Sequence, residues 1–389
     1  MNALWQMLKQ SDKQEKKVEY IELIYDLIFV YIIGRNNSLL HHFEGGFVEP
    51  GMFLSYVMCT LAVIQIWTFT AYYINLYGRN SARDHVFLFV NMFLLYFVAE
   101  GTRQDWQGYH TQYNVAWALI LVNVGLQYLI ERRNHRGEPH HMARTGRMAA
   151  ILFVEAAIVA LSVPVYEKTG NAWMALAAIL FGIVSVSLAG RKSCSSMVDF
   201  AHLSERVMLY VVFTFGEMII AIASYFEGEF NASSLYFSAM AFLIVVGLFL
   251  SYGVVYDHII DREMKTNGIG YILLHIVIIF ALNNITTAFE FMREEEVRLV
   301  PKMAFLIGSL VLYYGFLLAT SRYAKQRCRV RPGFILTMAA VGVSFAGLML
   351  LFRSQMVVNI ALTVAYVFGI FAFVHVSSRK MESEPEKTE

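Results

Sequence analysis

Three carboxylates lie at helical spacing in one apolar stretch near the start of the chain, VEYIELIYDLIFVYIIG. Glu19, Glu22 and Asp26 are three and four residues apart, which places them on one face of a helix. If this helix enters a membrane near Val18, Asp26 lies roughly 12 Å inside it, at about 1.5 Å per residue. A carboxylate at that depth costs several kcal/mol unless it is paired, protonated or hydrated. Asp26 is therefore a candidate site for a cation or a proton, with Glu22 and Glu19 nearer the membrane surface.

A second deep carboxylate, Glu217, lies in the apolar stretch HLSERVMLYVVFTFGEMIIAI. It follows Glu205 by twelve residues, so it would lie roughly 18 Å along the helix, near the centre of a bilayer. The adjacent Gly216 would allow another helix to approach closely. At the polar start of the same stretch, His202, Glu205 and Arg206 are candidate charge partners or gating groups for the deep acids.

A structural role is the alternative for all four acids. Buried carboxylates can accept hydrogen bonds from neighbouring helices and thereby fix the packing. For Asp26 and Glu217 we favour ion or proton handling, because charged groups in a membrane are expensive to retain. For Glu19 and Glu22 the two roles are evenly balanced. The candidate donors for a structural role are Tyr25, Tyr31, Tyr72, Tyr73, Asn75, Arg83 and Arg206.

Two groups of acids and histidines lie where apolar stretches begin or end. Such mixtures can bind a metal ion, but neither group has a supported ligand count or geometry. We therefore assign no metal ion and no cofactor. His275, about six residues into a later apolar stretch, is more often a hydrogen-bonded structural group at such a depth than a proton relay. The two groups are Asp257, His258 and Asp261 in SYGVVYDHIIDR, and Asp199, His202 and Glu205 ahead of Glu217.

The elements that position these residues are predicted to be membrane-spanning helices. The 389-residue chain is 57% hydrophobic and only 16% charged, whereas soluble domains carry about 25% charged residues. Continuous apolar runs of about 17 to 25 residues can cross a hydrocarbon core of roughly 30 Å, and they favour helices over barrel strands. We expect an all-α integral membrane protein with about twelve spans. These are residues 18–34, 51–75, 85–100, 113–130, 148–164, 172–190, 205–224, 235–256, 269–290, 302–320, 333–352 and 357–377.

The distribution of Lys and Arg tests this helix count. If the spans alternate in direction, 24 of the 31 Lys and Arg fall on the side of both termini and 7 on the other side. Such an excess marks the cytoplasmic side of a membrane protein. A missed or added helix would exchange the sides downstream and remove the bias. Both termini are therefore predicted to be cytoplasmic.

The spacing of the two deep acids suggests an internal repeat. Asp26 and Glu217 are 191 residues apart, close to half the chain, and both of their helices start on the same side. Two six-helix halves would then be parallel repeats, a design whose central interface holds the substrate site in many transporters. The predicted parts are a cytoplasmic segment 1–17, a first half 18–190, a second half 191–377 and a disordered cytoplasmic tail 378–389.

The deep acids also lie in motifs that resemble a known family. The first stretch resembles the Glu-Leu-Phe-Phe-Asp-Leu-Val-Phe-Val motif of the bacterial low temperature requirement A (LtrA) family, with Ile24-Tyr25 in place of the Phe pair. The second resembles the His-x-x-Glu-Arg…Gly-Glu motif of that family. The resemblance implies a multi-pass protein of the bacterial cell (inner) membrane and brings no substrate or reaction. The matching residues are Glu22, Leu23, Asp26, Leu27, Phe29 and Val30, and then His202, Glu205, Arg206, Gly216 and Glu217; Trp67, Arg83, Tyr256, Asp257 and His275 also have counterparts.

Three classes of function remain after this comparison. The leading hypothesis is a cation- or proton-coupled transporter or an ion-conducting protein, with Asp26 and Glu217 facing the pathway. The second is a membrane-embedded enzyme or lipid-handling protein that uses His202 and Glu205 with Asp257 and His258, although no nucleophile or phosphate-binding motif is present. The third is a non-catalytic scaffold or sensor.

The sequence also limits the partners. A net charge of +1 gives no basic field for nucleic acid. The predicted partners are therefore the lipid bilayer and a small ion or small molecule. The chain could also form a homo-oligomer.

Overall fold

Twelve long helices make up the fold of the described residues, which are 16–101, 106–191, 198–223, 231–294 and 296–383 of the computed structural model. Each predicted span corresponds to one of these helices, so the all-helical fold class is confirmed. The helices are α2 (Tyr20–Asn36), α3 (Pro50–Tyr77), α4 (Ala82–Glu100), α5 (Trp106–Asn134), α6 (Pro139–Thr169), α7 (Trp173–Arg191), α8 (Phe200–Ala223), α9 (Ala232–Val254), α10 (Ile269–Arg293), α11 (Leu299–Ala319), α12 (Pro332–Leu351) and α13 (Met356–Ser383).

Eleven helices of the described chain are long and apolar enough to cross a membrane. Helix α2 has 17 residues, which corresponds to roughly 26 Å, and it continues into a 3-10 helix, η1 (Asn37–His41). In a bilayer a helix satisfies its own backbone hydrogen bonds, which explains why long apolar runs of this chain are helical. The fold is consistent with a polytopic membrane protein.

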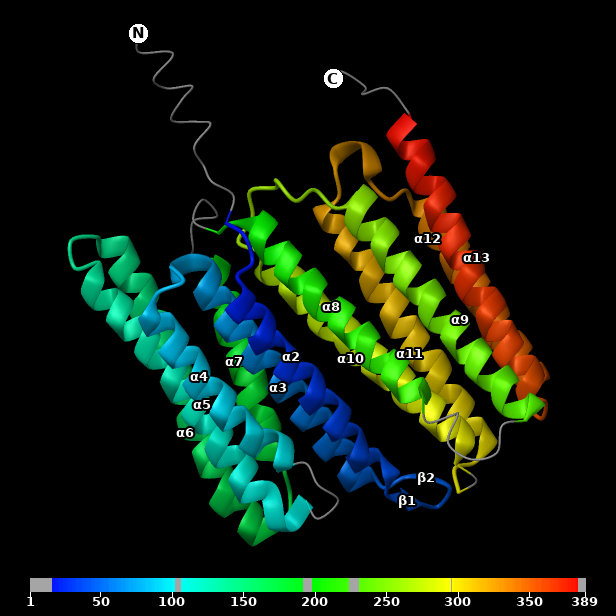
Figure 1. The fold of residues 1–389 in the computed structure, drawn as a ribbon, viewed down its shortest axis with the longest axis horizontal. Helices are drawn as coiled ribbons and strands as arrows, with labels where there is room; N and C mark the ends of the chain where they lie inside the picture. The colour runs from blue at the N-terminus through cyan, green and yellow to red at the C-terminus, as the bar shows by residue number, and fades with distance from the viewer. Residues whose placement is uncertain (1–15, 102–105, 192–197, 224–230, 295, 384–389) are drawn as a thin grey trace.

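Successive helices run up and down, and connections of the same predicted side meet. The backbone N–H of Arg298, between α10 and α11, donates to the carbonyl of Gly46, between α2 and α3. At the other end, Ile260 and Ala324 form a backbone bridge between two further connections. Helix α2 begins and α13 ends at the same end of the bundle (Figure 1). This arrangement agrees with the alternation that the Lys and Arg distribution requires.

Helices α3 and α10 are the most enclosed spans, and α12 is the least. One polar contact joins the two central helices, because the hydroxyl of Tyr56 on α3 donates to Asn284 at 2.5 Å and accepts from Asn283 at 2.8 Å. In Figure 1, α4, α5 and α6 lie to one side of α2 and α3, while α9, α12 and α13 lie beyond α8 and α10. Helices α2, α3, α8 and α10 therefore lie between the two outer groups.

Local sequence determines where several helices start and turn. Ser81 and Asp84 form a reciprocal capping box at the start of α4. Proline occupies the first position of α3, where its missing N–H costs no helical hydrogen bond. A short hairpin of β1 (Phe43–Glu44) and β2 (Phe47–Val48) follows η1, and its turn uses Gly45 and Gly46 at positive φ.

The structure extends several helices beyond their predicted bounds. Helix α13 continues to Ser383, so residues 378–383 of the tail predicted to be disordered are helical, and 384–389 lie outside the described residues. Helices α5 and α6 likewise reach beyond their apolar centres into polar sequence. Hydropathy detects only the part of a helix that can lie in hydrocarbon, whereas polar helix ends in water follow local propensity.

A hydrogen bond between η1 and α10 predicts a pH dependence of stability. His41 Nε2 lies 3.2 Å from Glu290 Oε2, and this contact raises the pKa of His41 above its ordinary value of 6.5. The stabilisation is fully present below about pH 6.5 and is lost as the pH rises through the higher folded-state value. We expect the free energy of unfolding of the wild type to exceed that of Glu290→Gln at low pH, by about 1 kcal/mol or less for this partly exposed pair. Thermal unfolding in detergent across neutral pH measures the difference, and a gap that widens toward alkaline pH would contradict the assignment.

Candidate functional site

Helices α2 and α8 pack side by side and run in the same direction (Figure 1). Three contacts in ascending order along both helices define this direction. Asp26 meets Arg206, the rings of Phe29 and Tyr210 are 6.2 Å apart, and Gly34 lies against Glu217. Both helices with deep acids therefore share one interface, which we call the α2–α8 seam.

A buried guanidinium joins the two helices at the centre of this seam. Arg206 donates from Nη2 to Asp26 Oδ1 at 2.9 Å and from Nε to Asp26 Oδ2 at 3.3 Å, a two-point contact. Its Nη1 lies 3.0 Å from Glu22 Oε2. All three side chains are at most 3% exposed. Desolvated charges of this kind are retained only when each has its partner, so the three groups depend on one another.

Trp67 of α3 adds a third helix to the cluster. Its indole N–H donates to Asp26 Oδ1 at 2.8 Å, and the guanidinium carbon of Arg206 lies 5.9 Å from the centre of its ring. The ring also packs against Tyr210, with centroids 4.7 Å apart. Trp67 thus covers the ion pair with apolar surface while it satisfies one carboxylate oxygen.

His202 extends the cluster toward the start of α8. The side-chain amide of Asn75 donates to its Nδ1 at 3.1 Å and to the carbonyl of Asp199 at 2.8 Å. With Nδ1 as acceptor, a neutral ring carries its proton on Nε2, which lies 3.6 Å from Glu22 Oε2. Nε2 makes no hydrogen bond within the described chain. His202 and Glu22 therefore lie close together without a hydrogen bond between them.

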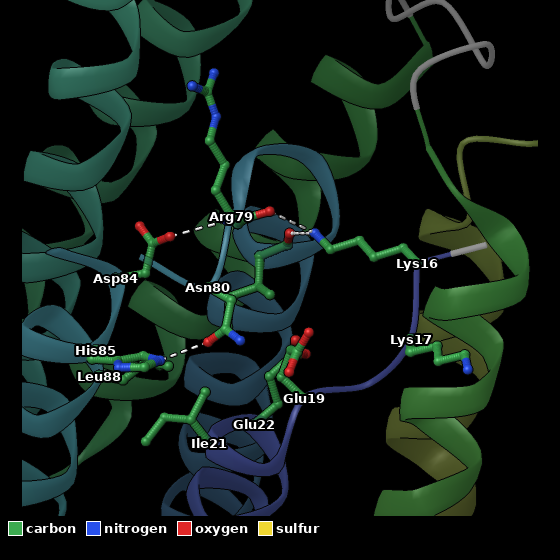
Figure 2. A pocket seen from close by; sticks show the side chains of 12 residues that line it. Lys16, Lys17, Glu19, Ile21, Glu22, Arg79, Asn80, Asp84, His85 and Leu88 are labelled. Carbon is green, nitrogen blue, oxygen red and sulfur yellow. Dashed lines mark hydrogen bonds between the residues drawn. The ribbon is translucent and has the colours of Figure 1, made fainter. Parts of the chain in front are cut away.

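A cavity of about 460 Å³ reaches this cluster at Glu22 (Figure 2). The ammonium of Lys16 donates to the carbonyls of Ile74, Asn75 and Gly78 at the end of α3, and burial lowers the pKa of this lysine. Lys16 therefore adds a donor to carbonyls at the end of α3, where the carbonyl of Ile74 also accepts from the backbone N–H of Gly78. The cavity is lined by Lys16, Lys17, Glu19, Ile21, Glu22, Ile74, Gly78, Arg79, Asn80, Asp84, His85 and Leu88.

Glu217 lies on the same seam but outside the Arg206 cluster. A Cβ added at Gly34 would clash with Oε1 of Glu217, so the glycine leaves the space that the carboxylate occupies. Gly34 is eight residues beyond Asp26, or roughly 12 Å along α2. Glu217 is half-buried, whereas Asp26 is fully buried. The two deep acids thus face one interface at different heights, and the cavity at Glu22 is lined by neither of them.

The other candidate residues do not join the cluster. Glu205 is exposed. It lies six residues after Asp199, which corresponds to a rotation of about 240° around the helix, so the two side chains point in different directions. Asp257 is exposed on a π-helical turn, η4 (Val255–Ile259), and His258 on the same turn contacts Glu382 at 3.2 Å. Among the residues that the structure describes, no three His, Cys, Asp or Glu are grouped as metal ligands.

His275 makes two polar contacts inside the bundle, away from the seam. Its Nδ1 lies 2.8 Å from the carbonyl of Tyr271, and its Nε2 lies 3.2 Å from the hydroxyl of Tyr252. A neutral ring donates to the former and accepts from the latter. His275 therefore links α10 to α9 and is separate from the seam.

Sequence reasoning missed three polar groups. Trp67 is a hydrogen-bond donor to Asp26, but a tryptophan in an apolar stretch gives no indication of its partner. Glu131 is fully buried and accepts from Arg83 at 2.6 Å, although its neighbours Arg132 and Arg133 suggest a solvated helix end. Glu155 is fully buried near the middle of α6. The same depth argument that identifies Asp26 could have identified Glu155.

Removal of the guanidinium should destabilise the protein strongly. Arg206→Met leaves Glu22 and Asp26 buried without a counter-charge, so we expect a loss of about 3–5 kcal/mol. Adding Glu22→Gln and Asp26→Asn to Arg206→Met should recover part of this loss. Thermal unfolding of purified protein in detergent gives the comparison, with the exposed Arg79→Met as the matched control. Equal midpoints for Arg206→Met and Arg79→Met would show that the cluster contributes nothing to stability.

Comparison with known proteins gives a family and one curated relative. The family model described as bacterial low temperature requirement A protein (LtrA) matches residues 17–371, which run from just before α2 into α13. Uncharacterized protein RA0937 of Rhizobium meliloti (strain 1021) is 24% identical over 236 residues, 56% of this chain and 53% of that protein. The chain therefore spans about half the length of this relative. No solved structure matches.

The family match includes both helices of the seam and all of the residues that surround Arg206. It spans well over half of the chain, and it includes the motif residues Glu22, Asp26, His202, Arg206 and Glu217. The chain belongs to the bacterial low temperature requirement A (LtrA) family.

Proposed function

We propose that the protein is a cation- or proton-coupled transporter or an ion-conducting membrane protein whose pathway follows the α2–α8 seam. The observation that carries the proposal is the order of ionisable groups along this seam. The cavity leads to Glu22, then to His202, Arg206 and Asp26, and roughly 12 Å further to Glu217. Such groups inside membrane helices characterise ion and proton pathways.

The charge of the cluster favours a cation or a proton as the ligand. Glu22 and Asp26 carry two negative charges when both are ionised, and Arg206 carries one positive charge. The remaining negative charge can be compensated by Lys16, which lines the same cavity as Glu22, by a protonated His202 or by a bound cation. A proton or a monovalent cation that arrives through the cavity would meet Glu22 first, because Glu22 lines the cavity and Asp26 does not.

The seam between Asp26 and Glu217 is closed by aromatic side chains. Phe29 and Tyr210 are each at most 3% exposed and lie between the two acids along the helices. In our proposal this aromatic layer separates the two binding positions, and passage requires α2 and α8 to shift relative to each other. Relative movement of two halves around a fixed site is the common form of alternating access.

The same proposal includes the halves and the membrane orientation. The halves 18–190 and 191–377 meet at the seam, and their first helices are parallel, which supports a parallel repeat. The end with 24 of the 31 Lys and Arg is assigned to the cytoplasm, together with both termini. The cavity at Glu22 lies between the start of α2 and the end of α3, so it would open to the cytoplasm.

Flux measurements test the proposal. Glu217→Gln removes a titrating group from a half-buried position without changing its shape, and we expect it to lower proton or cation flux at least about tenfold, equivalent to about 1.4 kcal/mol. Asp26→Asn combined with Glu217→Gln should abolish the flux. The assay uses proteoliposomes with a pH-sensitive dye inside and an imposed ion gradient, and Glu205→Gln on the exposed face of α8 is the matched control.

Two outcomes would count against a pathway. Flux that is unchanged in the Asp26→Asn, Glu217→Gln double variant would exclude the seam as the route. Lowered thermal stability, with flux per folded protein equal to that of Glu205→Gln, would favour a scaffold or sensor in which the acids only fix the packing.

A further inference from the structure

A buried carboxylate in the first half lies apart from the seam. Glu155 is fully buried near the middle of α6, about 16 residues or roughly 24 Å from the start of that helix. Neither of its carboxylate oxygens forms a hydrogen bond with the described residues. It therefore differs from Asp26 and Glu22, which have Arg206 as a counter-charge.

The neighbour of Glu155 is a side-chain amide. Oε2 of Glu155 and Nε2 of Gln65 both occupy the space that a Cβ on Gly182 of α7 would need, so the two side chains lie against each other beside that glycine. Gln65 donates from Nε2 to the carbonyl of Ile179 at 3.1 Å, and its own carbonyl oxygen, Oε1, has no hydrogen-bond partner in the described structure. A neutral Glu155 has an O–H that Gln65 Oε1 can accept.

Among the described side chains of the surrounding helices, no charged group compensates Glu155. Helix α3 contains no Lys, Arg, Asp or Glu, and α7 has only Arg191 at its last position. On α6 itself, Arg147 lies two turns away and Glu167 more than three turns away. On α5, Glu131 is paired with Arg83 near the helix end. An isolated carboxylate in such surroundings takes up a proton rather than retaining its charge.

Two further polar residues of α3, Thr68 and Tyr72, lie between this position and one end of the bundle. A small cavity of about 20 Å³ lies beside Gln65 and Thr68, and most of its other lining residues are apolar. Tyr72 lines this cavity and a second of similar size, which Arg144 also lines. Gln65, Thr68 and Tyr72 are three and four residues apart on α3, so they share one helix face. The hydroxyl of Tyr72 accepts from Arg144 at 3.0 Å.

We propose that Glu155 and Gln65 form a second proton-binding site, in the first half of the molecule, which exchanges its proton along the α3 face of Thr68 and Tyr72. The ligand is a proton held by the Glu155 carboxyl group, and Gln65 accepts the resulting O–H. Gly182 provides the space for both side chains. The site shares no residue with the α2–α8 seam, so this inference can be tested independently of the proposed transport function.

Infrared spectroscopy tests the proton directly. At neutral pH in detergent, the difference spectrum between wild type and Glu155→Gln should contain the carbonyl stretching band of a protonated carboxylic acid. The difference between wild type and Glu205→Gln should contain the bands of an ionised carboxylate instead. Glu155→Gln preserves size and should keep the thermal midpoint of the wild type, which separates the loss of the band from unfolding.

Exchange into deuterated water distinguishes a binding site from a fixed structural proton. We expect the Glu155 band to shift within minutes, and we expect Tyr72→Phe to slow this shift at least about tenfold without removing the band. A wild-type spectrum without the band would overturn the assignment of a proton to Glu155. A band that never shifts in the folded protein would contradict the proposed exchange of the Glu155 proton with solvent, and Glu155 would then be a structural acid.

Discussion

Arg206 and its two carboxylates fix how α2 and α8 can pack, because charges without water tolerate no loss of a partner. The two-point contact with Asp26 sets both the rotation and the height of one helix against the other. The contact of Nη1 with Glu22, one turn earlier on α2, constrains the same rotation and height. Trp67 brings α3 into the same arrangement through its hydrogen bond to Asp26. A buried ion cluster of this kind contributes specificity of packing even where its net stabilisation is small.

The other features of the seam follow from that register. With Asp26 opposite Arg206, the same parallel packing brings Gly34 opposite Glu217, and the missing side chain at Gly34 leaves room for the carboxylate in its present position. Glu22 is held at the end of the cluster where α2 begins, so it lines the cavity between α2, α3 and α4. One constraint therefore separates a buried acid that lines a cavity, a second buried acid and a half-buried acid along a single interface.

The sequence predicts well how deep a residue lies in a membrane-spanning helix, but it predicts poorly which residue of another helix it contacts. Hydropathy and the Lys and Arg distribution give one predicted span for each of the twelve helices, because both depend on segments that are local in sequence. Arg206 and Asp26 are 180 residues apart, so the sequence offers Arg206 only as one of several candidate partners and no local pattern selects it. Glu205 illustrates the same limit, since its position in a motif does not reveal that it points outward. Glu155, in contrast, could have been identified from its position near the middle of an apolar stretch alone.

The outward face of α2 is apolar and lies away from the cluster. Tyr20, Ile24, Leu27 and Tyr31 are large, exposed and spaced along one face of the helix, opposite the acids. In a bilayer this apolar face meets lipid, which can neither solvate Asp26 nor deliver an ion to it. Trp67 and Tyr210 cover the cluster from the protein side. Among the described residues, the cavity at Glu22 reaches the cluster where α2 begins, and Asp26 does not line that cavity.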